Sequence, residues 1–184
     1  DKESRKPWVK AVFVHELAEV ESKFRSKLNI DKFLKYNKIP GLQGVNTRKL
    51  TKILRDNGTM KAMLTSDISN MEEIINKIKN YKVTNVVKEV TSKTIYEIGN
   101  GNLNIGLLDF GSKQNIINSL IKRNCKVTVF PSDTCRNEIL SKNFDGLVLS
   151  NGPGDPEDNE KSIQTIKEIY ESKFQKPILG ICLG

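Results

Sequence analysis

Short apolar runs alternate with amphipathic stretches through the second half of the chain. Four of these runs are apolar at successive positions and too short for helices, so we expect strands at 105–110, 126–130, 145–150 and 177–181. The stretches between them predict helices at 114–122, around 138–140 and after Asp155. Strands without polar alternation that are joined by helices indicate a parallel sheet covered on both faces. In such a sheet, ligands bind at the carboxyl ends of the strands.

The helix after Asp155 has a clear starting signal. Asp155 is a good cap, Pro156 suits the first turn, and acidic residues follow. Its apolar positions are expected to form one stripe against the sheet, made of Ile163, Ile166, Ile169, Tyr170 and Phe174.

The first half mixes strand and helix patterns. Strands are expected at 8–14 and 60–65, and helices at 30–36, at 47–57 and at 71–78. Asn29 is the predicted cap of the first helix and Asn46 or Thr47 that of the second, which Gly58 ends.

Residues 82–102 lack helical periodicity and contain Gly99-Asn100-Gly101-Asn102, so we interpret them as a linker. Within them, 86–90 is a candidate strand. The expected organisation is an α/β domain fragment over residues 1–90 and a second α/β domain over residues 103–184.

Composition and charge exclude several classes of protein. Hydrophobic residues make up 37% of the 184 positions and charged residues 28%, as in folded globular proteins. The net charge is +8, but the lysines are spread along the chain without a basic cluster, so we expect no nucleic-acid partner. No apolar run is long enough to cross a membrane, and residues 1–6 do not resemble a signal peptide.

The three cysteines are Cys125, Cys135 and Cys182. Their odd number and the lack of C-x-x-C spacing argue against a disulfide framework and against a metal site. Free thiols fit the reducing cytoplasm, which is the location that we expect. Cys125 is expected in the core, and Cys135 near a helix start.

Cys182 lies in Gly180-Ile181-Cys182-Leu183-Gly184, directly after an apolar strand. A nucleophile at a sharp turn from strand to helix has strained backbone, and the residues two before and two after it come close together. Glycine at both of those places relieves the crowding. We therefore interpret Cys182 as a nucleophile rather than as a buried structural cysteine.

A second glycine-rich loop follows another strand. Ser150-Asn151-Gly152-Pro153-Gly154-Asp155-Pro156 contains two glycines and two prolines. Its backbone amides suit an oxyanion or a carboxylate, but the same composition also suits a rigid connection that only starts the next helix. Its position beside the Cys182 turn favours the anion-binding role.

A cysteine nucleophile normally needs a base. The only histidine is His15, which belongs to the first half and follows an apolar run. We interpret it as structural, and we expect the base to lie outside this chain.

Five segments resemble known families. Gly180–Gly184 resembles the nucleophile motif of class I glutamine amidotransferases, and Ser150–Pro156 is similar to their oxyanion strand. Asp109–Asn115 resembles the D-[FY]-G-x-K-x-N segment of the carbamoyl phosphate synthetase small-subunit family. Ile39–Leu50 and Lys52–Met60 are similar to the I-P-G-I-x-G-I-D-T-R-x-L and L-R-x-x-G-x-M segments of that same family.

This resemblance implies a fold and a site. Residues 103–184 would be the first part of a flavodoxin-like class I glutamine amidotransferase domain, after a partial N-terminal domain, in a chain truncated at both ends. Cys182 would be the nucleophile of a Cys-His-Glu triad whose other members lie outside these residues. Gly152 and Leu183 would donate backbone amides to the oxyanion, and Gly154 would help to seat glutamine.

The resemblance also implies a function. The complete subunit would hydrolyse glutamine and supply ammonia to a large subunit, which makes carbamoyl phosphate for arginine and pyrimidine synthesis. ATP and Mg²⁺ would bind to that large subunit, and this chain would hold no cofactor. The chain alone would be inactive. Two alternatives stay open, namely the glutaminase of another amidotransferase and a non-catalytic scaffold subunit with the same fold.

Overall fold

A computed structural model describes residues 3–18 and 28–184. The chain forms two compact units. The N-terminal unit is Lys6–Lys82, and the C-terminal unit is Val83–Gly184 together with the first residues up to Arg5. The expected domain limits, 1–90 and 103–184, stay predictions.

In its described residues, the N-terminal unit contains one short pair of parallel strands and three helices. β1 (Val12–Phe13) pairs with β2 (Gly41–Leu42). The helices are α1 (Ile30–Tyr36), α2 (Thr47–Asn57) and α3 (Met71–Asn80). The three helices expected in this half are thus confirmed.

Side chains cap two of these helices as expected. The Asn29 side chain accepts a hydrogen bond from the Asp31 N–H of α1 at 2.7 Å. Of the two candidate caps for α2, Asn46 fills the role, since it accepts from the Lys49 N–H at 3.0 Å. Gly58 ends α2 with a φ of +77°, a conformation that favours glycine.

The expected strands of this half are only partly present. The strand expected at 8–14 shrinks to Val12–Phe13, and the strand expected at 60–65 is wrong. Met60, Met63 and Leu64 are exposed. A strand needs a partner for its backbone N–H and C=O groups, and the described residues provide none there.

A five-stranded sheet forms the centre of the C-terminal unit. Its strands lie in the order β3-β5-β4-β6-β7. β4, β5, β6 and β7 are parallel, whereas β3 pairs antiparallel with β5. The strands are β3 (Tyr96–Ile98), β4 (Leu103–Asp109), β5 (Cys125–Pro131), β6 (Gly146–Leu149) and β7 (Ile178–Gly180). The expected α/β class with a parallel sheet is confirmed.

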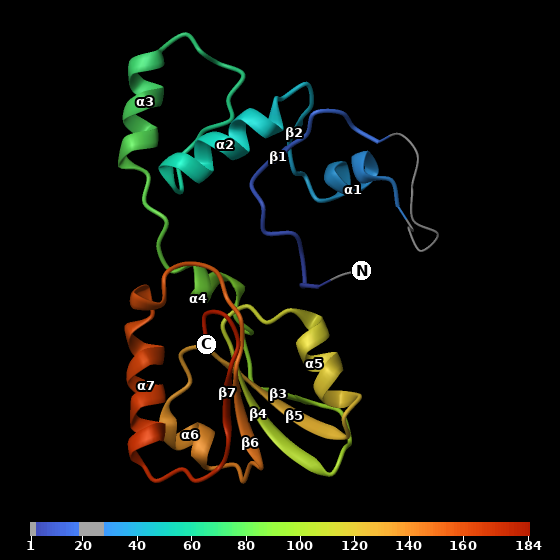
Figure 1. Ribbon diagram of the computed structural model, residues 1–184, viewed down its shortest axis with the longest axis vertical. Coiled ribbons are helices and arrows are strands. Elements are labelled where there is room, and N and C mark those ends of the chain that lie inside the picture. The colour runs from blue at the N-terminus through green and yellow to red at the C-terminus, as the bar shows by residue number, and fades with distance from the viewer. Residues whose placement is uncertain (1–2, 19–27) are drawn as a thin grey trace. The chain divides into compact units, whose positions relative to one another are not determined.

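Helices cover both faces of this sheet (Figure 1). On one face, Ile117 of α5 packs with Leu107, Val129 and Val148. On the other face, Val87, Ile139 and Ile169, from α4, α6 and α7, pack with Leu108, Phe130 and Leu149. Leu107 and Leu108 face opposite sides because side chains alternate along a strand. The helical elements are α4 (Val86–Val90), α5 (Gln114–Ile121), α6 (Arg136–Leu140), the 3₁₀ turn η1 (Pro156–Asp158) and α7 (Glu160–Glu171).

The segment interpreted as a linker belongs to the C-terminal unit. Residues 86–90 form a helix and not a strand, and Val87 of this helix is buried in the core. Residues 96–98 add β3 to the edge of the sheet. The linker interpretation is therefore wrong for most of residues 82–102.

The stripe expected on α7 and just after it is partly correct. Ile169 is buried, and Ile166 and Phe174 are partly buried against the core. Ile163 and Tyr170 are exposed, and Ser162 and Thr165 are buried in their place. The Ser162 hydroxyl donates a hydrogen bond to the Ser132 carbonyl at 2.8 Å, so a polar residue is satisfied inside. Asp155 caps η1 by accepting from the Glu157 N–H at 3.1 Å, and α7 starts after it.

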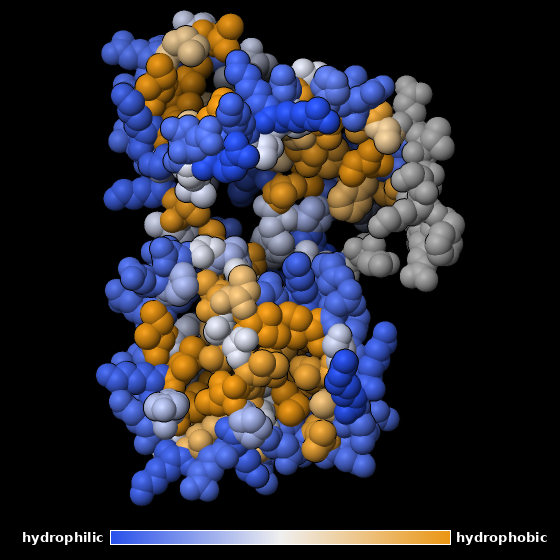
Figure 2. Space-filling model, in the orientation of Figure 1, coloured by the Kyte–Doolittle hydropathy of each residue, from blue (hydrophilic) through white to orange (hydrophobic). Residues whose placement is uncertain are grey.

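Apolar surface remains exposed on the C-terminal unit. Figure 2 shows it gathered over the strands of this unit. Leu103 and Leu179, which lie on strands, are about half exposed. Among residues 3–18 and 28–184, we find no helix with the length and apolar character needed to span a membrane.

Candidate active site

Cys182 lies just past the carboxyl end of β7 on strained backbone. Its φ is +60°, in the left-handed region that residues other than glycine rarely adopt. A Cβ atom on Gly180 would come within 2.6 Å of the Gly184 carbonyl oxygen, so the turn closes tightly around the cysteine. The Cys182 side chain is exposed. The glycine-flanked turn expected from the sequence is present, while the role of Cys182 stays a prediction.

The glycine-rich loop after β6 lies against the same turn. Leu149 of β6 pairs with Gly180 of β7, so the two strands end side by side. A Cβ atom on Gly152 would lie 2.5 Å from the Phe110 carbonyl oxygen and 2.6 Å from Leu183 Cδ2. Only glycine fits at this position. Gly152 and Leu183, the two residues singled out as amide donors, are therefore neighbours in space.

Gly154 lies farther along the same loop. Its φ is +89°, and a Cβ atom there would lie 2.6 Å from Val86 Cγ2 at the start of α4. Both the backbone conformation and the close approach of α4 require glycine. The proposed contact of Gly154 with a substrate stays a prediction.

Asp109 ends β4 and shapes the loop that follows it. Its Oδ1 accepts hydrogen bonds from the N–H groups of Gly111 at 2.9 Å and Ser112 at 2.7 Å. Its Oδ2 accepts from the Ser92 N–H at 2.7 Å. A buried carboxylate with three backbone donors holds residues 110–113 in one conformation and joins them to the segment before β3.

Thr91 extends this network to the end of β5. Its hydroxyl donates to the Asp109 carbonyl at 2.5 Å and accepts from the Ser132 N–H at 2.9 Å. Neither Asp109 nor Thr91 was predicted from the sequence to have a role at the site. The Asp-x-Gly pattern after a strand is typical of an Asx turn and could have indicated Asp109, whereas no local pattern marks Thr91.

The chain's single histidine does not belong to the C-terminal unit. His15 is exposed and lies in the N-terminal unit. Within residues 3–18 and 28–184, no three side chains of His, Cys, Asp or Glu come together as metal ligands. The Cys182 site thus combines an exposed thiol with nearby backbone amides, and its unit supplies no imidazole.

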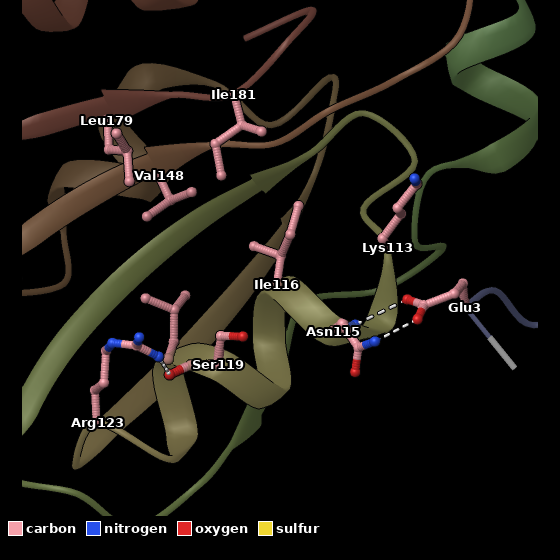
Figure 3. Close-up of a pocket in the computed structure, with 10 residues that line it drawn as sticks. Glu3, Lys113, Asn115, Ile116, Ser119, Arg123, Val148, Leu179 and Ile181 are labelled. Atoms are coloured by element: carbon pink, nitrogen blue, oxygen red, sulfur yellow. Dashed lines mark hydrogen bonds between the residues drawn. The ribbon is translucent and has the colours of Figure 1, made fainter. Parts of the chain in front are cut away.

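A pocket of about 620 Å³ lies on the α5 side of the sheet. Its apolar lining comes from α5, β6 and the end of β7, as Ile116, Val148, Leu179 and Ile181 show in Figure 3. Its lining does not include Cys182 or the glycine-rich loop. The candidate site is therefore the group of strand ends around Cys182, because neither a cysteine nor the glycine-rich loop lines the pocket.

This arrangement suits attack on a carbonyl carbon. Cys182 offers sulfur at the carboxyl end of a parallel strand, where α/β sheets bind ligands. Thiolates are the nucleophilic form of cysteine and form covalent acyl intermediates. Backbone N–H groups beside such a sulfur can stabilise the oxyanion that forms during attack. Acyl transfer through a thioester is the chemistry that the residues support.

Two family models match the chain. The model "Glutamine amidotransferase class-I" matches residues 106–184. The model "Carbamoyl-phosphate synthase small chain, CPSase domain" matches residues 1–64. The first match contains the Cys182 turn, and the second lies in the other half.

Curated relatives match along the whole chain. The carbamoyl phosphate synthase small chain of Clostridium perfringens is 44% identical over 184 residues, which are 100% of this chain and 52% of the relative. Those of Listeria monocytogenes and Streptococcus pneumoniae are 41% and 43% identical over 185 residues, or 50% and 51% of their lengths. The chain spans about half the length of the curated relatives it matches. With two family models in its two halves and relatives of one name along its full length, the chain is similar throughout to part of the carbamoyl phosphate synthase small chains.

Proposed function

We propose that the protein containing this chain hydrolyses the side-chain amide of glutamine, with Cys182 as the nucleophile. The observation that carries the proposal is the strained turn at Cys182, whose φ is +60°, next to the loop that bears Gly152. The match of residues 106–184 to class I glutamine amidotransferases supports glutamine as the substrate. The names of the relatives, carbamoyl phosphate synthase small chains, support the wider reaction.

The reaction proceeds through a thioester. The Cys182 thiolate attacks the amide carbon, and the carbonyl electron pair moves onto oxygen. The N–H groups of Gly152 and Leu183 donate to this oxyanion, and each such donor contributes about 3 kcal/mol. The carbon–nitrogen bond then breaks, and the nitrogen takes up a proton and leaves as ammonia. Water hydrolyses the thioester, which gives glutamate and the free thiol, while Gly154 seats the substrate backbone.

The proton for the leaving nitrogen needs a donor. The C-terminal unit has no histidine, so we place the acid–base histidine, and the glutamate that orients it, outside residues 83–184. In this proposal, this chain contributes the nucleophile and the oxyanion donors to the site.

A second subunit uses the ammonia. The relatives are named small chains, and we propose that a large subunit binds ATP and Mg²⁺ and forms carbamoyl phosphate, the precursor for arginine and pyrimidine synthesis. This chain contains no G-x-x-x-x-G-K-[ST] loop for a nucleotide. We place the contact with the large subunit in the N-terminal unit, because residues 1–64 match the model specific to small chains.

The test is glutamine hydrolysis by the full gene product that contains residues 1–184. Glutamate and ammonia are measured for the wild type, for Cys182→Ser and for Cys135→Ser. The alcohol is far less ionised than the thiol at neutral pH, so Cys182→Ser should lower kcat by several orders of magnitude. Cys135 is also exposed and serves as the matched control, which should keep its activity. Near-normal hydrolysis by Cys182→Ser would overturn the proposal.

A further inference from the structure

The side chain of Asn151 joins the two loops of the candidate site. Its Oδ1 accepts a hydrogen bond from the Lys113 N–H at 3.0 Å, and its Nδ2 donates to the Gly111 carbonyl at 3.3 Å. Both partners belong to the loop after β4, whereas Asn151 opens the loop after β6. One amide side chain thus uses both its ends to hold the loops at a fixed spacing.

Ser150 adds a second connection beside it. Its fully buried hydroxyl accepts from the Phe110 N–H at 2.9 Å and donates to the Asn151 carbonyl at 2.9 Å. The second bond bears directly on Gly152. The Asn151 carbonyl and the Gly152 N–H belong to one planar trans peptide and point in opposite directions, so a bond that fixes the carbonyl also fixes the N–H.

The loop to which Asn151 is joined is itself rigid. Asp109 holds the N–H groups of Gly111 and Ser112, and Gly111 has a φ of +115°. A Cβ atom on Gly111 would lie 2.6 Å from Val90 Cγ2, so this turn is closely packed as well. Asn151 therefore ties the glycine-rich loop to a segment whose conformation is already fixed.

Gly152 cannot hold its own orientation by a side chain. Glycine has more conformational freedom than any other residue, and its peptide can turn unless its neighbours prevent it. The hydrogen bonds of the Asn151 side chain and of the Asn151 carbonyl hold the residue directly before Gly152. A turned peptide would present a carbonyl oxygen, instead of an N–H, to the developing oxyanion.

We infer that Asn151 is a positioning residue that aims the Gly152 N–H at the oxyanion through its bridge to Gly111 and Lys113. The inference rests on the proposed function. Asn151 itself touches no reacting atom in this scheme, so its effect is on the transition state and not on substrate affinity.

The test compares Asn151→Ala with Asn159→Ala in the full gene product. Asn159 is the matched control, because its side chain also donates to a backbone carbonyl, that of Asp155 at 2.9 Å, but not to the loop after β4. Loss of one oxyanion donor costs roughly 100- to 1,000-fold in kcat, so a misaimed donor should cost roughly 10- to 100-fold, with KM little changed. Asn159→Ala should keep both constants.

Amide hydrogen exchange separates positioning from a general loss of stability. In Asn151→Ala the Lys113 amide should exchange faster, while core amides of β4 keep their protection. Asn151→Asp keeps the acceptor for the Lys113 N–H but sets a second oxygen against the Gly111 carbonyl. It should therefore protect Lys113 and still lower kcat.

The outcomes distinguish this inference from the proposed function. An active wild type with an unchanged kcat in Asn151→Ala would overturn the inference and leave the proposed function standing. Faster exchange throughout β4, or a raised KM with an unchanged kcat, would also overturn it. A wild type that does not hydrolyse glutamine would overturn the proposed function, and the inference with it.

Discussion

The Glu3 carboxylate accepts hydrogen bonds from both the backbone N–H and the side-chain amide of Asn115, which lies 112 residues later (Figure 3). The backbone bond is 3.1 Å long. The Glu3 carbonyl also accepts from the Gln114 N–H at 2.9 Å. Lys113, at the start of α5, provides no side-chain cap. Glu3 therefore caps a helix of the C-terminal unit from the far end of the sequence.

We predict that Glu3→Ala lowers the free energy of unfolding of the C-terminal unit by about 1 kcal/mol, since a helix cap and a favourable charge at a helix start are lost together. Urea unfolding measures the change. Glu171→Ala, at an exposed position in α7, is the control and should stay within about 0.5 kcal/mol of the wild type. Equal losses in both variants would show that Glu3 does not cap α5 in solution.

We expect Asp109 to contribute more to the free energy of unfolding than an exposed aspartate that accepts a single backbone hydrogen bond. Asp109→Ala leaves three backbone N–H groups without their acceptor, and we predict a loss on the order of 3 kcal/mol in the free energy of unfolding. The control is Asp145→Ala, because the exposed Asp145 side chain accepts only from the Asn104 N–H at 2.8 Å among the described contacts. Denaturant unfolding of the two variants measures both losses. A loss no greater in Asp109→Ala than in Asp145→Ala contradicts the account of this network.

Gly152→Ala should harm both folding and catalysis. The added Cβ would meet the Phe110 carbonyl oxygen at 2.5 Å, and backbone cannot move aside as a flexible side chain can. We predict a loss of about 1–3 kcal/mol in stability and a fall of roughly 100- to 1,000-fold in kcat, measured by unfolding and by ammonia release.

The control for this variant is Gly58→Ala. Gly58 also has a positive φ, of +77°, but nothing lies within 4 Å of its missing Cβ. Gly58→Ala should lower the free energy of unfolding by about 1 kcal/mol, because of the positive φ alone, and should leave kcat unchanged. An unchanged kcat in Gly152→Ala would remove this loop from the site.

The ion pairs of Glu97 should make the stability of the protein depend on pH. Hydrogen bonds first from Lys126 and then from Lys142 hold the pKa of Glu97 below its ordinary value of 4.5. The ion pairs measure 2.7 Å and 3.3 Å and join β3 to β5 and to the chain after α6. Because the folded pKa is the lower one, this stabilisation is present above pH 4.5 and is lost as the pH falls through the folded value.

Glu97→Gln should remove this contribution. The wild type should unfold at a higher urea concentration than Glu97→Gln at neutral pH, and the difference should shrink as the pH falls below 4.5. Because the pair is exposed, about 1 M salt should also reduce the difference at neutral pH. A difference that grows on acidification would contradict the assignment.

Local patterns predicted the elements that are regular and apolar. The strands that contain Leu107, Val129 and Val148 were expected because continuous apolar runs between helices are typical of buried parallel strands. The turn at Cys182 was expected because glycines at fixed spacing mark it. These features depend on residues within one short window of sequence.

Long-range contacts decided the rest. Ser162 and Thr165 face inward on α7 because the carbonyls of Ser132 and Thr134 accept their hydroxyls, at 2.8 Å and 3.4 Å, and those carbonyls lie about 30 residues earlier. β3 exists because it pairs with β5, far along the chain. The bridge from Asn151 to Lys113 likewise spans 38 residues. The sequence pattern within one helix, strand or loop does not indicate which residue of another element it will contact.

Our last prediction concerns a polypeptide of residues 1–184 expressed alone. An alkylating reagent should modify its exposed Cys182, but the polypeptide should release no ammonia from glutamine above the level of Cys182→Ser. An amide nitrogen leaves only after it takes up a proton, and an enzyme normally supplies that proton from a positioned acid. The one histidine is His15, in the N-terminal unit. Mass spectrometry of the alkylated protein and an ammonia assay test both statements. Turnover that depends on Cys182 would show that an acid exists within these residues, and its loss in His15→Ala would identify His15 as that acid.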